Sequence, residues 1–137
     1  TNSQILMYRR KLSGPLIDRI DILIEVPALK YEDLIEKKPE NISAKIREKV
    51  ERARLIQRER FTKQKTNSEM DLSEIKKYCQ LSSDSENLLK KAVNSGKLSA
   101  RGYHRVLKVA RTIADLEGSK NITFAHLSEA LMYRLRD

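Results

Sequence analysis

The amino-acid sequence predicts a mainly α-helical fold with a single β-strand near its start. Of the 137 residues, 39% are hydrophobic but only 5% are aromatic, and this composition suits a modest helical core. Apolar residues recur at helical spacing through most of residues 43–137, whereas the alternation typical of a strand occurs over residues 20–26. We therefore expect a helical bundle to which one strand is attached.

Residues 10–26 predict a capped helix, a corner and a strand in direct succession. Ser13 can cap a short helix that opens at Gly14, because the proline that follows has the fixed φ that suits a first helical turn. Arg19 falls at the end of that helix. One strand cannot form a sheet by itself. The hydrophobic strand over residues 20–26 therefore implies partner strands outside this sequence, and we expect the chain to be the last part of a larger module.

A long basic helix is expected over residues 43–61, after a connector of residues 27–41 that has room for one helical turn. Ile46, Val50 and Phe61 follow helical spacing, and arginine, lysine and glutamate fill most of the other positions. Two interpretations remain open: the basic face is solvated and balanced by local ion pairs, or it contacts a polyanion. The second interpretation singles out three candidate DNA-contacting residues, Arg54, Arg58 and Arg60.

Four helices are expected after a mobile surface loop, which we place at residues 62–68 because this segment has no apolar residue. Serine, threonine and aspartate are the side chains that cap helix N-termini best, and a glutamate three positions later completes a capping box. The expected helix starts are Asp71 or Ser73, a capping box in residues 83–86, Ser99 and Thr123.

The helix that follows Ser99 is the clearest amphipath in the chain. Its apolar side runs from Tyr103 to Ala114. Cations early on a helix oppose its own dipole, so an external phosphate is a fitting partner for Arg101; the alternative is a solvated face. The residues expected on the basic side are Arg101, His104, Arg105, Lys108 and Arg111.

The sequence contains little that could support chemistry by itself. Cys79 is the single cysteine, so an internal disulfide is excluded, and its apolar neighbours predict a core residue rather than a catalytic thiol. His104 and His126 lack the nearby carboxylates or cysteines of a metal site or a triad, and we expect no metal site. Glycine-rich phosphate loops are absent.

Charge and hydropathy indicate the kind of partner. The formal net charge is +9, from 28 Lys and Arg against 19 Asp and Glu, which favours polyanions such as nucleic acid or nucleotide without specifying one. The sequence has no apolar run of about eighteen residues and does not begin with a signal region. We expect a cytoplasmic protein with no membrane contact.

Three blocks of sequence carry a resemblance to a known family. They are Leu-Ser-Gly-Pro-Leu-Ile-Asp-Arg-Ile-Asp at residues 12–21, Ala-Arg-x-x-Gln with Arg-Phe within residues 53–61, and Leu-Ser-Ala-Arg-Gly-Tyr-His-Arg with Ala-Arg-Thr-Ile-Ala-Asp-Leu-Glu-Gly within residues 98–118. Together they resemble the magnesium-chelatase-like AAA+ ATPases, in the competence-associated, ComM-like branch. The resemblance covers residues 4–134.

The resemblance implies the C-terminal part of an AAA+ module with three regions. Residues 1–28 would end the ATPase core with the arginine-finger helix and the last core strand. Residues 29–70 would be a pre-sensor insertion that contains the long helix over residues 43–61 and a loop. Residues 71–137 would form the helical lid.

The resemblance also implies roles for two arginines. Arg19 matches the arginine finger, which would reach ATP bound in a neighbouring subunit, and Arg101 matches the sensor-2 arginine, whose action in cis or in trans stays open. A guanidinium suits this task because it offers a planar fork of donors and a permanent charge. ATP and Mg²⁺ are the cofactors implied for the intact protein, and we expect neither on this chain, because the family's Walker motifs lie outside it.

The function implied is that of a homo-oligomeric ring, a hexamer, which couples ATP hydrolysis to the remodelling of DNA. The full-length protein would be an ATPase, whereas this chain alone is expected to be inactive. Two alternatives stay open. The chain could be a stand-alone basic DNA-binding module without ATPase activity, or an oligomerisation piece in which Arg19 and Arg101 affect assembly alone.

Overall fold

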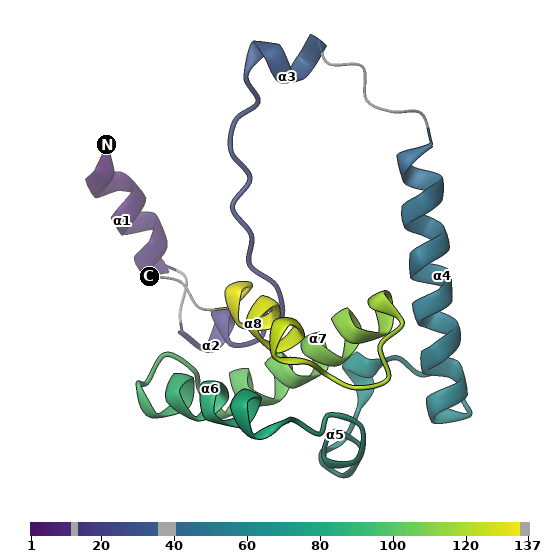
Figure 1. Cartoon of the computed structure of the whole chain (residues 1–137). Helices are drawn as coiled ribbons and strands as arrows, with labels where there is room; N and C mark the ends of the chain where they lie inside the picture. Colours follow the sequence, from purple (N-terminus) through teal and green to yellow (C-terminus); the bar gives the residue numbers. More distant parts are fainter. Residues whose placement is uncertain (12–13, 36–40, 135–137) are drawn as a thin grey trace.

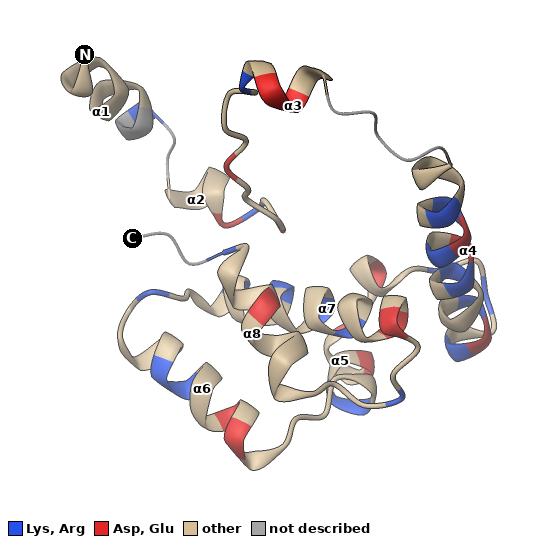
Figure 2. Ribbon diagram, turned by 45° about the horizontal axis from the view of Figure 1, so that its top comes forward, with Lys and Arg blue, Asp and Glu red and all other residues tan. Residues whose placement is uncertain are grey.

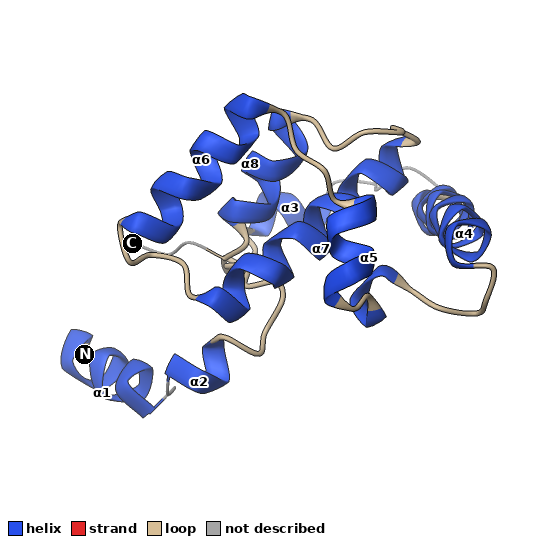
Figure 3. Cartoon of the chain, turned by 90° about the horizontal axis from the view of Figure 1, so that it is seen from below, coloured by secondary structure: helices blue, strands red, loops and turns tan. Residues whose placement is uncertain are grey.

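The computed structural model describes residues 1–11, 14–35 and 41–134, with the backbone alone at residues 9 and 10. Within those ranges the chain forms helices joined by loops and no β-strand (Figures 1 and 3). The prediction of a mainly helical fold is confirmed. The helices are α1 Asn2–Lys11, α2 Gly14–Ile17, α3 Tyr31–Ile35, α4 Ile42–Phe61, the 3₁₀ helix η1 Asn67–Glu69, α5 Leu72–Tyr78, α6 Ser83–Asn94, α7 Ala100–Glu117 and α8 Phe124–Met132.

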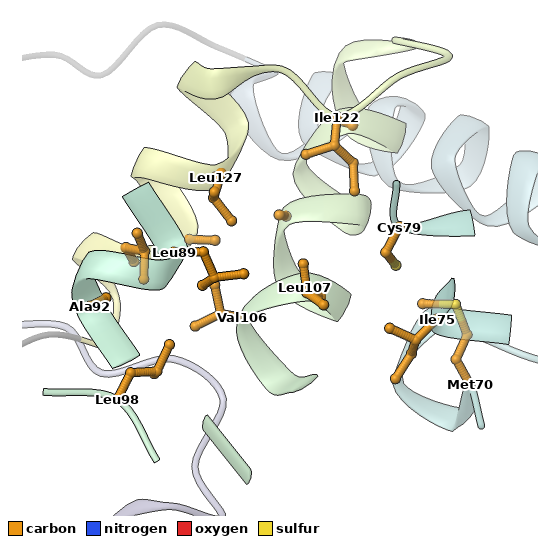
Figure 4. Packing of buried hydrophobic residues seen from close by; sticks show 14 of the residues in the cluster. Met70, Ile75, Cys79, Leu89, Ala92, Leu98, Val106, Leu107, Ile122 and Leu127 are labelled. Atoms are coloured by element: carbon orange, nitrogen blue, oxygen red, sulfur yellow. The ribbon is translucent and has the colours of Figure 1, made fainter. Parts of the chain in front are cut away.

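The core is a helical bundle organised around α7. Helices α4, α5, α6 and α8 all pack against it, and Figure 1 shows α7 in the middle of the bundle. Figure 4 shows Val106 and Leu107 of α7 among the side chains of the neighbouring helices, including Leu89 of α6 and Leu127 of α8. Each of these four side chains is at most 4% exposed. Full burial of one such side chain contributes about 1.5–3 kcal/mol, so the bundle holds most of the stability.

Side-chain caps set the beginnings of the bundle helices. Asp71 caps α5, Ser99 caps α7 and Thr123 caps α8, in each case by accepting a hydrogen bond from a backbone N–H three residues later. These three starts are confirmed, and Asp71 is the cap of the two residues considered. The prediction for α6 was wrong by one residue, because Ser82 is the cap and Glu86 closes no capping box.

The strand predicted over residues 20–26 does not form. The segment has no regular secondary structure, and its Ile22 and Val26 side chains are 50% and 79% exposed. A strand is stable only when a neighbour completes its hydrogen bonds, and the described residues provide no such neighbour. Helix α1, which the sequence reading did not foresee, precedes this segment and points away from the bundle (Figure 3).

Helix α4 confirms the long helix predicted over residues 43–61. Its packing against the bundle differs along its length. Its last two turns lie against α7 through the buried Ala53, Gln57 and Phe61, whereas its first half extends beyond the bundle (Figure 1). The prediction of a surface loop over residues 62–68 is wrong at Asn67, because this residue is 1% exposed and begins η1. A polar side chain is stable there because buried partners satisfy its hydrogen bonds.

Candidate functional site

Arg19 lies in the turn that follows α2, and its side chain is exposed. Its backbone N–H donates to the carbonyl of Leu16 at 3.1 Å, which closes the turn. Its guanidinium has no ion-pair partner among the residues that the structure describes. Ser13, the expected cap of α2, lies outside the described residues. Arg19 therefore presents an unneutralised charge to solvent.

The turn that carries Arg19 is held by Arg134, which lies just beyond the end of α8. The Arg134 guanidinium donates to the backbone carbonyls of Ile17 at 3.4 Å and of Asp18 at 3.0 Å, and also to that of Ile20. The Arg134 side chain is only 5% exposed. Basic side chains commonly satisfy the free carbonyls at a helix end in this way. Carbonyls on both sides of Arg19 are thus bound by one buried cation.

Two further contacts fasten the same segment to the bundle. Asp21 pairs with Arg105 of α7 at 2.6 Å, with the two side chains 46% and 34% exposed. The Leu23 N–H donates to the Tyr133 carbonyl at 2.8 Å. A partly exposed ion pair contributes at most about 1 kcal/mol, so the buried Arg134 is the main polar anchor of the three.

Arg101 lies in the first turn of α7, and its side chain is exposed and has no ion-pair partner within the described ranges. The next residue, Gly102, is packed closely: a Cβ there would lie 2.8 Å from Leu98 Cδ1 and 3.2 Å from Arg134 Nε. A side chain at this position would force these neighbours to shift. Arg134 therefore lies between the turn of Arg19 and the turn of Arg101.

Arg111 departs from the basic face that the sequence reading drew on α7. It is 4% exposed, and its guanidinium pairs with Asp115 at 3.2 Å and donates to the carbonyls of Ser119 at 2.8 Å and Lys120 at 3.0 Å. Burial lowers the pKa of the Arg111 guanidinium, against the opposing effect of Asp115. The placement of Arg111 on the outer basic face was wrong, because Asp115 draws it inward, whereas His104, Arg105 and Lys108 are half-buried on that face.

Arg60 also points into the protein. Its guanidinium forms a bidentate pair with Asp115 at 2.7 and 2.5 Å and donates to Asn67 Oδ1 at 2.9 Å, with 11% of its side chain exposed. Asn67 in turn donates from Nδ2 to Asp115 at 2.8 Å. This buried polar network, made of Arg60, Asn67, Arg111 and Asp115, connects α4 and η1 with α7. Arg60 therefore does not share the exposed surface of the other two candidate DNA-contacting residues.

Arg54 and Arg58 remain on the exposed side of α4. Neither is in an ion pair within the described ranges. Figure 2 shows Lys and Arg along much of α4, with fewer acidic residues between them. Between this helix, α7, α8 and residues 21–24 lies a groove of about 1480 Å³, whose lining includes Arg101 and Lys108.

Other candidate groups are structural. Cys79 is 5% exposed, as expected for a core residue, and burial raises the pKa of its thiol to about 11. His126 accepts a hydrogen bond at Nδ1 from the Thr123 N–H at 3.0 Å and contacts Glu117 through Nε2. The expectation that His126 has no carboxylate neighbour was therefore wrong. Within the described ranges, no group of three or more His, Cys, Asp or Glu is placed to hold a metal ion.

The sequence reading missed Arg134 as a site residue. Its partners are backbone carbonyls more than a hundred residues away, as the 116-residue separation from Asp18 illustrates, and backbone groups leave no signal in a sequence. The one available signal was Gly102, because a glycine in the first turn of a strong helix indicates close packing. None of the helices in the described ranges has the length and apolar character required to cross a membrane.

Comparison with known proteins is consistent with the resemblance. The magnesium chelatase subunit ChlI C-terminal family matches residues 40–134, and the magnesium chelatase subunit ChlI family matches residues 1–34. The chain is 46% identical over 132 residues to competence protein ComM of Haemophilus influenzae, covering 96% of this chain and 26% of that protein. It is 40% identical over 139 residues to the uncharacterized protein YifB of Escherichia coli, covering 100% of this chain and 27% of that protein.

These matches extend over nearly the whole chain, although the chain spans only about a quarter of the length of these relatives. The matched C-terminal family alone includes the bundle, α4 and both Arg101 and Arg134. The chain belongs to the magnesium-chelatase-like family of AAA+ proteins, in the branch that contains ComM and YifB.

Proposed function

We propose that this chain forms the arginine-bearing C-terminal part of an ATPase that assembles into a ring, a hexamer, and couples ATP hydrolysis to the remodelling of DNA. Arg19 is the arginine finger, which acts on ATP held by the neighbouring subunit, and Arg101 is the sensor-2 arginine. One observation carries the proposal: these two exposed guanidiniums have no ion-pair partner within the described ranges and lie in turns that share the contact with Arg134.

The chemistry of the two arginines supports a phosphate partner. Arg60, Arg111 and Arg134 are already bound by carboxylates or carbonyls, so their charge is not available to a ligand. Arg19 and Arg101 keep their donors free for an anion, and a guanidinium stabilises the charge that develops on a transferring phosphoryl group.

The described residues fit the phosphate part of ATP and not its metal ion. Guanidinium donors suit phosphate oxygens, whereas Mg²⁺ prefers carboxylates and water, and no carboxylate cluster occurs within the described ranges. When bound, Mg²⁺ would neutralise phosphate charge, and the residues that hold it belong to other parts of the module. What this chain contributes is positive charge at two fixed positions.

The division into core end 1–28, insertion 29–70 and lid 71–137 belongs to the same proposal. Helix α4 is the main helix of the insertion, and its last two turns pack on α7 of the lid. DNA contact is assigned to the exposed arginines of α4, Arg54 and Arg58, and no longer to Arg60.

A stand-alone DNA-binding module is the second candidate function. Arg54 and Arg58, which are exposed and form no ion pair with any described residue, favour it as much as they favour the ring ATPase. A DNA-binding module gives no role to Arg19, the exposed arginine in the turn that Arg134 holds. For that reason this candidate ranks second.

ATP turnover by the intact protein tests the proposed function. Replacing an arginine finger removes transition-state charge stabilisation, so Arg19→Ala should lower turnover by about a thousandfold. Lys90→Ala is the control, because Lys90 is an exposed cation that belongs to α6 and to neither of these turns, and it should leave turnover unchanged. Wild-type turnover in Arg19→Ala would remove Arg19 from the ATPase site.

A further inference from the structure

Arg134 is a charged residue in a place where charge is costly. Its side chain is 5% exposed, and its partners are three backbone carbonyls and the Asp18 carboxylate at 3.5 Å. A buried cation is tolerated only when hydrogen bonds replace the water that it loses. The carbonyls that replace water here belong to the end of α2 and the turn of Arg19. The stability of Arg134 in its buried position thus depends on this turn being in place.

The turn of Arg19 also depends on Arg134 for its position. No residue of α2 is fully buried, so the short helix has no core of its own to fix it against the bundle. Two further ties of the same segment are the partly exposed pair of Asp21 with Arg105 and a backbone hydrogen bond from Leu23. Polar contacts centred on Arg134 therefore connect the end of α2 with the bundle.

The same side chain lies against the first turn of α7. A Cβ placed on Gly102 would lie 3.2 Å from Arg134 Nε, which is a tight contact. Gly102 directly follows Arg101. Arg134 is consequently enclosed on one side by the turn of Arg19 and on the other by the turn of Arg101.

We infer that Arg134 is a positioning residue that holds the turn of Arg19 against the first turn of α7. Arg19 and Arg101 then keep a fixed separation, and any movement of the lid carries both arginines together. The consequence for ATP turnover rests on the proposed function, whereas the geometric part does not. A lid that moves when nucleotide binds in one subunit would thereby also shift Arg19, the arginine finger that this subunit presents to the neighbouring subunit.

The geometric part is tested by the distance between residues 19 and 101 in the full chain. Spin labels on Arg19→Cys and Arg101→Cys report this distance by double electron–electron resonance, because the native Cys79 is buried and reacts little. Arg134→Met should broaden the distribution of distances. A second label pair, Asn87→Cys with Lys120→Cys, joins exposed positions within the bundle and should keep its distribution.

A narrow, unchanged distribution between residues 19 and 101 in Arg134→Met would overturn the inference. If both label pairs broaden, the variant has lost its fold, and Arg134→Lys decides. Lysine keeps the charge but lacks the planar fork of donors with which Arg134 spans these carbonyls, so it should broaden only the pair at residues 19 and 101. If Arg134→Lys broadens the distance distribution of neither label pair, or of both, the inference also fails.

The catalytic part is tested by the kinetics of the intact protein. A finger displaced by about 1 Å can lower turnover by about a hundredfold, so Arg134→Met should reduce kcat by about tenfold to a hundredfold with little change in KM for ATP. Arg134→Lys should recover part of the loss. Unchanged kcat with a broadened distance distribution would refute this part alone, whereas unchanged kcat in Arg19→Ala would refute the proposed function instead.

Discussion

At the scale of single residues, burial changes what a side chain can do, and Cys79 is a direct example. Burial raises the pKa of its thiol from an ordinary value of 9.0 to about 11. The thiolate is the reactive form, so alkylation by iodoacetamide at pH 8 should be about a hundredfold slower in the native chain than in urea. Mass spectrometry of timed samples measures both rates, and equal rates would show that Cys79 is accessible.

The same shift predicts how stability depends on pH. The folded thiol keeps its proton up to about pH 11, whereas the unfolded thiol loses it near 9.0. Folding therefore favours the protonated form, and the stability from this group is fully present below pH 9.0 and decreases as pH rises to about 11. Urea titrations across this window should show the decrease in the wild type and a smaller one in Cys79→Ala.

The arginines show why the burial of a charged side chain was hard to predict from sequence. Helical spacing placed Arg60 and Arg111 on charged faces, but Arg111 is buried and the Arg60 side chain is only 11% exposed. The reason is Asp115, which lies 55 residues from Arg60 in sequence and accepts from both guanidiniums. Spacing within α4 cannot reveal this partner of Arg60 on α7, whereas the pair of Arg111 with Asp115, four residues apart on α7, could have been found from spacing. Arg19 and Arg101 are both exposed, and the phosphate contacts expected for them stay predictions.

At the scale of helices, the buried polar network joins α4 to α7, and its removal should be costly. Asp115→Ala leaves two buried guanidiniums without their carboxylate, which typically destabilises a protein by about 3–5 kcal/mol. Urea unfolding of the chain measures this loss. The control is Glu48→Ala, which removes an exposed pair with Arg52 on α4 and should cost less than about 1 kcal/mol. Similar losses in the two variants would contradict a stabilising role for the network.

Helix α4 also offers the clearest test of DNA contact. Each lysine or arginine that neutralises a phosphate adds about one to the salt slope of binding. Arg54→Glu combined with Arg58→Glu should therefore weaken binding of the chain to duplex DNA and lower the slope by about two. Lys90→Glu with Lys91→Glu on α6 changes net charge equally and should have a much smaller effect. If the two double variants behave alike, binding depends on overall charge and not on α4.

The helices were more predictable than the strand for a physical reason. A helix start is encoded locally, and Asp71, Ser99 and Thr123 act as caps as predicted. A strand depends on a neighbouring strand, and no strand forms among the described residues to pair with residues 20–26. The exposed side chains of this segment, such as Val26 at 79% exposure, are those that a neighbouring strand and sheet would cover.

At the scale of the whole molecule, the chain consists of a packed bundle from which two parts extend. Helix α4 lies on one side, with the exposed Arg54 and Arg58 in its second half, and α1 lies on another (Figure 2). The bundle between them contains Arg101, Arg134 and the buried polar network. Such an arrangement suits a part that connects a DNA contact to two phosphate-binding arginines, which is the proposed role within a ring.

The central claim is that Arg19 acts on ATP held by a neighbouring subunit, and a mixing experiment on the intact protein tests it most directly. One variant is Arg19→Ala, and the other has its own phosphate-binding loop disabled; each alone should be inactive. In a mixed ring, the disabled subunit can present its Arg19 to the intact ATP site of the Arg19→Ala subunit, so mixing should restore measurable ATP hydrolysis. A mixture that remains as inactive as its separate components would contradict the account.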